Sequence, residues 1–178
     1  MRNIKNVFLY GSSGVGKSTI INKIVNSVSC SIGGFKEEHI LNGEEKTFNI
    51  ISMLDGEIKG TIGEFKYIDG SYKLISMDRT FNVQGVDILM NSLNKDLIIM
   101  DELGRLEDRA EEFKAMVNKV LNSNKVVLGV IKPFDTRFLK EIKSREDVVT
   151  IEVTLSNREY IEDEIKEILK KSNINFSL

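Results

Sequence analysis

Eight consecutive residues near the start of the chain have the types and spacing of a phosphate-binding loop. The segment Gly11-Ser12-Ser13-Gly14-Val15-Gly16-Lys17-Ser18 fits the pattern G-x-x-x-x-G-K-[ST] without a mismatch. Such a loop surrounds a phosphate with backbone N–H groups, and glycines allow the torsions and the close approach that this requires. Lys17 would place a positive charge at the β- and γ-phosphates, and the Ser18 hydroxyl would ligate Mg²⁺.

An acidic pair supplies the second half of the predicted chemistry. Asp96-Leu97-Ile98-Ile99-Met100 is a continuous apolar run that leads directly into Asp101 and Glu102. A buried strand that ends in a carboxylate is typical of a Walker B segment, so we expect Asp101 to orient Mg²⁺. Glu102 would polarise the attacking water as a general base. Acidic residues are also common in solvated turns after strands, but the complete phosphate-binding loop favours the functional interpretation.

The elements that must position these residues alternate between strand and helix. Val7-Phe8-Leu9-Tyr10 predicts a buried strand that ends at the loop, and apolar residues at three- and four-residue spacing from Lys17 predict a helix. Further strands are predicted at 96–100, 126–131 and 148–153, and helices at 87–93, 110–121, 136–143 and 160–170. Apolar strands separated by amphipathic helices indicate a parallel sheet covered on both faces. We therefore expect a single α/β domain over residues 1–178.

A segment of different character lies between the first helix and the later alternation. Asp55-Gly56 separates two β-prone runs, which predicts an antiparallel β-hairpin insertion over about residues 47–65, at the side of the main sheet. Gly33-Gly34 indicates the exit from the first helix, and the charged Glu37 and Glu38 that follow are expected on a loop.

Composition and charge exclude several classes of protein. Hydrophobic residues make up 41% of the 178 residues and the formal net charge is -2, so neither a disordered chain nor a dedicated nucleic-acid binder is indicated. No apolar run is long enough to span a membrane, and Met1 to Asn6 has no signal-peptide character. Cys30 is the only cysteine, which favours a reducing compartment. We expect a soluble, cytoplasmic protein without dedicated membrane or nucleic-acid binding.

These residues together resemble the THEP-type family of small P-loop nucleoside-triphosphatases, which includes the animal cancer-related nucleoside-triphosphatase. The loop is similar to the family's G-x-x-G-V-G-K-[ST]-T, which extends the phosphate-binding set to Thr19. Similar segments are Gly33 to Glu38, Asp101 to Glu107, which looks like D-E-[IL]-G-[KR]-M-E, and Thr154 to Arg158. Leu106 replaces the usual Met, and residues 69–86 match poorly.

The resemblance implies a fold, a reaction and a cofactor. The fold would be a three-layer P-loop NTPase sandwich with a mainly parallel sheet. The activity would be Mg²⁺-dependent hydrolysis of nucleoside triphosphates such as ATP and GTP to diphosphate and phosphate, with broad base preference. The partners expected are therefore the nucleoside triphosphates themselves.

Several other side chains have two open interpretations. Arg158 opens the last helix and would either stabilise the transferring phosphate, as a third catalytic residue beside Lys17 and Glu102, or stack on the base, or remain a surface arginine. Arg105 is close to Glu102 but would equally pair with Glu107 or Asp108. Glu37 and Glu38 would contact the metal shell or be solvated charges. The role of Lys132, after the strand at 126–131, is open.

Three other activities would use the same loop. A kinase needs an acceptor site, and small nucleotide kinases close an arginine-rich lid, whereas the seven arginines here are dispersed. A nucleotide-gated switch that binds a protein partner is not excluded by any residue. Asp101-Glu102-Leu103-Gly104 also fits the D-x-x-G of GTPases, but neither Asn94-Lys95 nor Asn124-Lys125 completes a guanine-reading N-K-x-D segment.

Overall fold

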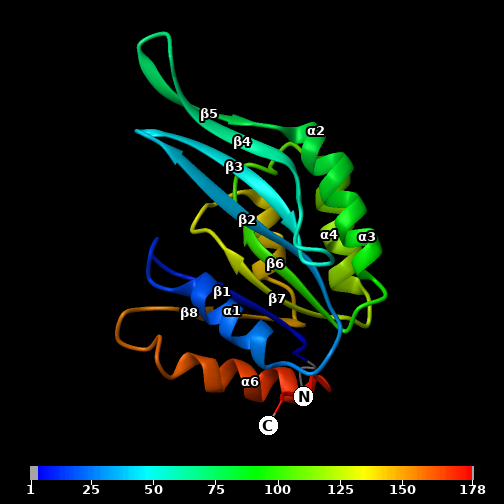
Figure 1. Cartoon of the computed structure of the whole chain (residues 1–178). Coiled ribbons are helices and arrows are strands. Elements are labelled where there is room, and N and C mark those ends of the chain that lie inside the picture. The colour runs from blue at the N-terminus through cyan, green and yellow to red at the C-terminus, as the bar shows by residue number, and fades with distance from the viewer. Residues whose placement is uncertain (1–3, 178) are drawn as a thin grey trace.

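A computed structural model describes residues 4–177 and shows one eight-stranded sheet with helices on both faces (Figure 1). The strand order is β5-β4-β3-β2-β6-β7-β1-β8. The strands are β1 (Asn6–Tyr10), β2 (Ile32–Asn42), β3 (Glu45–Ser52), β4 (Ile58–Ile68), β5 (Ser71–Ser76), β6 (Leu97–Leu103), β7 (Val126–Ile131) and β8 (Val148–Glu152). The helices are α1 (Lys17–Ser27), α2 (Asp78–Thr80), the π-helical η1 (Phe81–Gly85), α3 (Val86–Ser92), α4 (Glu111–Asn122), α5 (Arg137–Lys143) and α6 (Ile161–Lys171).

The parallel half of the sheet consists of β2, β6, β7, β1 and β8. One face packs against α1 and α6, and the other against α3, α4 and α5, so each face has its own apolar cluster. Phe113 of α4 contacts the rings of Phe35 and Phe81, with centroids 5.6 and 5.0 Å apart. The predicted three-layer α/β sandwich with a mainly parallel sheet is confirmed. Among residues 4–177, no helix combines the length and apolar character needed to cross a membrane.

The antiparallel half extends the sheet at the β2 edge. β2 pairs with β6 in parallel through its first residues and with β3 in antiparallel fashion from Phe35 onwards, and β3, β4 and β5 follow as a meander. Asp55-Gly56 lies between β3 and β4, as predicted, with Gly56 at a φ of 76°. The insertion is larger than the predicted hairpin, because β5 adds a third strand and residues 45–52 and 58–68 form the first two.

Two local predictions were wrong. Glu37 and Glu38 lie within β2 and not on a loop, because Gly34 continues the strand instead of ending it. Gly34 has a φ of 96°, and a Cβ atom there would lie 1.9 Å from the carbonyl oxygen of Ile99 on β6. A glycine is therefore required by the close approach of two strands. The second correction concerns β6, which continues through Asp101 and Glu102 to Leu103 instead of ending at Met100.

Candidate active site

The phosphate-binding loop connects the buried strand β1 to the N-terminus of α1. Gly11, Gly14 and Gly16 have φ angles of 143°, 76° and 108°, which L side chains rarely adopt. A Cβ at Gly11 would also lie 2.3 Å from the carbonyl oxygen of Val153. The loop therefore has the glycines where its backbone needs them, and the free N–H groups of the first turn of α1 lie beside it.

Lys17 folds back over this loop. Its Nζ donates hydrogen bonds to the carbonyl oxygens of Gly11 and Ser12, at 2.9 and 2.8 Å. Burial lowers the pKa of Lys17, although the carboxylates of Glu102 and Asp101 act in the opposite direction. A bound phosphate would add further negative charge beside the ammonium group, which is the arrangement predicted for this lysine.

Ser18 and Asp101 join the loop to β6. The Ser18 hydroxyl donates to Oδ1 of Asp101 at 3.2 Å. Asp101 is buried, and burial raises its pKa to about 6; the hydrogen bond from Ser18 opposes this, and the nearby charges of Glu102 and Glu37 add to it. A hydroxyl and a carboxylate among further carboxylates are hard oxygen donors with excess negative charge, so these residues fit Mg²⁺.

Glu102 forms an ion pair with Lys132, a residue whose role the sequence leaves open. Glu102 lies where the β6–β7 register shifts, and an irregularity of this kind redirects a side chain. Its Oε1 is 2.5 Å from Nζ of Lys132, which directly follows β7. Lys132 is also 3.7 Å from Glu37. Burial alone would lower the pKa of Lys132, but Glu37 and Glu102 outweigh it and the pKa is raised. Lys132 therefore stays charged and holds both carboxylates.

His39 lies beside the same carboxylates. Its Nε2 is 3.3 Å from Glu37 and 3.9 Å from Glu102. These three side chains come from β2 and β6 and lie close enough together to share a ligand. Because Lys132 already pairs with both carboxylates, the cluster is an ion-pair network at the edge of the predicted site.

All these groups face one cleft of about 620 Å³. It is lined by Gly11, Ser13, Gly14, Gly16, Lys17, Ser18, Thr19, Glu37, His39, Lys46, Phe48, Asp101, Glu102, Lys132, Pro133 and Phe134. Of the predicted loop residues, Ser12 and Val15 do not line it, and Val15 packs in the core. The structure thus brings together most of the predicted loop with Asp101 and Glu102.

Three candidate residues lie outside the cleft. Arg158 is exposed in the turn segment before α6 and is not among the residues that line the cleft. Arg105 contacts neither Glu107 nor Asp108 through an ion pair recorded within residues 4–177, and its guanidinium lies 4.9 Å from the Phe134 ring centroid. Glu38 does not line the cleft either. The signal that could have found Lys132 is its position at the carboxyl end of a parallel strand, the edge at which such sheets bind ligands.

The comparison with known proteins agrees with this geometry. A family model described as NTPase matches residues 6–166. The chain belongs to this NTPase family. Relatives in the family are named nucleoside-triphosphatase THEP1: that of Thermotoga maritima is 34% identical over 92% of this chain and 95% of its own. That of Thermotoga petrophila is 36% identical, with 92% of each chain covered.

A solved structure of the family has the same fold. The crystal structure of THEP1 from the hyperthermophile Aquifex aeolicus matches with a TM-score of 0.73 and 26% identity, covering 93% of this chain and 99% of that one. Membership of the NTPase family, expected from the loop and the Asp101–Glu107 segment, is therefore confirmed, and with it the classification as an enzyme.

Proposed function

We propose that this chain hydrolyses nucleoside 5'-triphosphates to the diphosphate and phosphate, that the reaction requires Mg²⁺, and that several bases are accepted. The observation that carries the proposal is the convergence of Lys17, Ser18–Asp101 and Glu102 on one cleft from α1 and β6. The names of the relatives support nucleoside triphosphates as the substrate class.

Substrate binding would begin at the loop. Backbone N–H groups from Gly11 to Ser18 and the N-terminal end of α1 would hold the phosphate oxygens. Lys17 would exchange its hydrogen bonds to the two loop carbonyls for bonds to the β- and γ-phosphates. Ser18 and Asp101 would hold Mg²⁺, which when bound supplies positive charge to the phosphate oxygens.

Glu102 would position the water. Its carboxylate would take a proton from the water, whose oxygen forms a bond to the γ-phosphorus while the bond from that phosphorus to the bridging oxygen breaks and that oxygen leaves with the diphosphate. Lys132 would hold the carboxylate in place through their ion pair. A carboxylate held at the right place lowers the barrier chiefly through orientation.

Broad base preference and a cytoplasmic location also belong to this proposal. The chain has no complete N-K-x-D segment with which to select guanine, which supports acceptance of several bases. A single cysteine suits a reducing compartment. Turnover across ATP, GTP, CTP and UTP measures the preference directly, and a large excess for one base would contradict it.

The central test is phosphate release from ATP as the only nucleotide. We expect release with Mg²⁺, none with excess EDTA, and a loss of about 10²-fold or more in Glu102→Gln with binding of a non-hydrolysable ATP analogue retained. Glu38→Gln, on the same edge but outside the cleft, is the matched control and keeps wild-type turnover. Wild-type turnover in Glu102→Gln, or phosphate transfer only when an acceptor is added, would overturn the proposal.

A further inference from the structure

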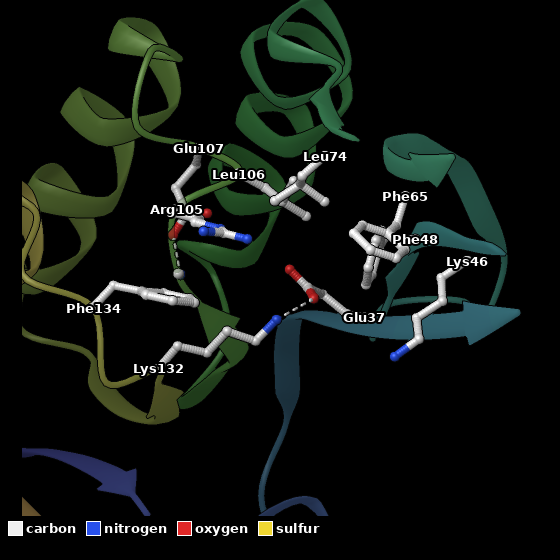
Figure 2. A pocket seen from close by; sticks show the side chains of 11 residues that line it. Glu37, Lys46, Phe48, Phe65, Leu74, Arg105, Leu106, Glu107, Lys132 and Phe134 are labelled. Atoms are coloured by element: carbon white, nitrogen blue, oxygen red, sulfur yellow. Dashed lines mark hydrogen bonds and ion pairs between the residues drawn. The ribbon is translucent and has the colours of Figure 1, made fainter. Parts of the chain in front are cut away.

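A second cavity lies next to the cleft, on the side of the antiparallel strands. It encloses about 230 Å³ and is lined by Glu37, Lys46, Phe48, Phe65, Leu74, Gly104, Arg105, Leu106, Glu107, Lys132 and Phe134. Figure 2 shows Phe134 on one side of the hollow and Phe48 and Phe65 on the other. Five of these residues also line the cleft, and the other six, Phe65, Leu74, Gly104, Arg105, Leu106 and Glu107, line this cavity alone.

Glu107 is the unusual group in this cavity. The residue is only 1% exposed. Its Oε1 accepts a hydrogen bond from the backbone N–H of Gly104, while Oε2 has no hydrogen-bond partner among the residues that the structure describes. A buried, unpaired carboxyl oxygen is costly, and native proteins rarely leave one without a role. The carboxyl group is therefore an unpaired polar group at the wall of this cavity, and a small movement of the side chain would bring Oε2 to a ligand.

The cavity differs from the cleft in the ligands that it suits. The ion pair of Lys132 and Glu37, 3.7 Å apart, lines both spaces, and Figure 2 shows it at the border of the second one. On the cleft side lie the loop glycines and the carboxylates. Phe48 and Phe134 line both spaces, but only the second adds the apolar side chains of Phe65, Leu74 and Leu106, so it favours a flat apolar body over a triphosphate.

The size of the cavity and the hydrogen bonding of Glu107 limit further which ligands it could hold. Pockets for drug-sized ligands take about 300–1,000 Å³, so a smaller one suits a molecule of one or two fused rings. Burial raises the pKa of Glu107 to about 8, with the charge of Glu37 adding to the effect. The carboxyl is then protonated at neutral pH, and because Oε1 already accepts from Gly104, the proton belongs on Oε2. Its partner must be an acceptor.

We propose that this cavity is a second small-molecule site, which takes a planar nitrogen heterocycle of nucleobase size between Phe134 and Phe48–Phe65, with a ring nitrogen that accepts a hydrogen bond from Glu107. Arg105, whose guanidinium stacks on Phe134, borders the same space. Binding at this site does not require hydrolysis, so its test uses the protein without nucleoside triphosphate.

The test compares two rings of the same shape. Benzimidazole has a ring nitrogen that accepts a hydrogen bond, and indole has a carbon in its place. Binding of each to the intact protein is measured by titration calorimetry, with adenine as a third probe. We expect benzimidazole and adenine to bind, and benzimidazole to bind about tenfold more tightly than indole, which corresponds to one hydrogen bond of about 1.4 kcal/mol.

Variants then locate the binding. Leu74→Trp places a large ring in the cavity and removes binding of both probes, while Lys73→Trp, on the opposite face of β5, keeps it. Glu107→Gln retains a donor and the preference for benzimidazole, whereas Glu107→Met makes the two probes equal. The Leu74→Trp result stands even if Glu107→Met does not fold.

Three results would overturn the proposal. They are a wild-type protein that binds none of the probes, equal affinity for benzimidazole and indole, and unchanged binding in Leu74→Trp. Since no triphosphate is present, failure here leaves the proposed hydrolysis intact, and loss of hydrolysis in Glu102→Gln leaves this site intact.

Discussion

At the carboxyl ends of β1, β6 and β7, the parallel half of the sheet surrounds about 620 Å³ with backbone amides, carboxylates and lysines. Beside it, the antiparallel strands and the segment after β6 enclose about 230 Å³ between aromatic side chains and one buried acid. The first space contains a local backbone motif, the loop from Gly11 to Thr19, whereas the second is lined only by residues from elements far apart in the sequence. Glu37, Lys46, Phe48, Lys132 and Phe134 line both, so a ligand in one space would contact side chains that also face the other.

The largest expected effect comes from Lys17→Ala, which removes the positive charge from the polar cleft. Turnover should fall by about 10²- to 10³-fold, since a charge aimed at the transferring phosphate is lost, and nucleotide affinity should also fall. Phosphate release and calorimetry with an ATP analogue measure both. Lys23→Ala, on the same helix but paired with Glu162 at 3.7 Å, is the control and should retain activity. Normal turnover in Lys17→Ala would show that the cleft does not bind phosphate.

The second effect is expected at Glu107 in the apolar cavity, as a change of folding stability with pH. The pKa of Glu107 is raised in the folded state, so its contribution to stability is fully present below about pH 4.5 and is lost as pH rises through about 8. Relative to Glu107→Gln, which stays neutral, the wild type should lose roughly 4 kcal/mol of unfolding free energy between pH 5 and pH 9.

Urea denaturation of the two proteins at both pH values measures this difference. The other charged groups around the cavity are the same in both proteins, so their effects on stability largely cancel in the comparison. Parallel pH profiles for wild type and Glu107→Gln would mean that Glu107 is ionised in the fold, and the contrast between the two spaces would then be weaker.

A smaller effect is expected at Lys132, which lines both spaces. Lys132→Met keeps the length of the side chain but releases Glu102 and Glu37 from their common cation. We expect kcat to fall about tenfold with a smaller change in KM, because the carboxylate loses its position while the loop is unchanged. Lys125→Met, before the opposite end of β7, is the control. A change in KM alone would assign Lys132 to substrate binding instead of positioning.

The smallest effect should follow from Arg158→Ala. The side chain is exposed and outside both spaces, so turnover should stay within about twofold of wild type. The exposed Arg137, which pairs with Glu141, provides a comparison variant. A loss of tenfold or more in Arg158→Ala would show that the turn before α6 closes on the nucleotide, and would extend the polar cleft beyond its present lining.

The sequence predicted the parallel half well for a physical reason. The strands β1, β6 and β7 are apolar on both faces, and the loop has its glycines at positions of positive φ, so short-range patterns identify them. The family, the sandwich and the elements that hold Lys17 and Asp101 all followed from such patterns. The roles of Lys17, Ser18, Asp101 and Glu102 stay predictions until activity is measured, and Arg158→Ala tests the catalytic role that the sequence suggested for Arg158.

The antiparallel half was predicted less well. Glu37 and His39 of β2 line the cleft. These polar residues interrupt the alternation of apolar and polar residues that identifies a strand, so the sequence did not predict β2. No sequence motif marked Lys132 or Glu107 as a site residue either. Their importance arises from distances between separate elements, such as the 2.5 Å from Lys132 to Glu102, which spacing along the chain does not encode.

The absence of a side chain at Gly34 has a consequence for both binding spaces. Gly34 pairs with Ile99, and two residues further on Lys36 pairs with Asp101. Any larger residue at position 34 would push β2 and β6 apart where Gly34 lies beside Ile99. Glu37 lies only about 10 Å along the same strand, so that separation would alter its alignment with its lysine partner. The distance between Glu37 and Lys132 thus depends on the absence of a side chain at Gly34.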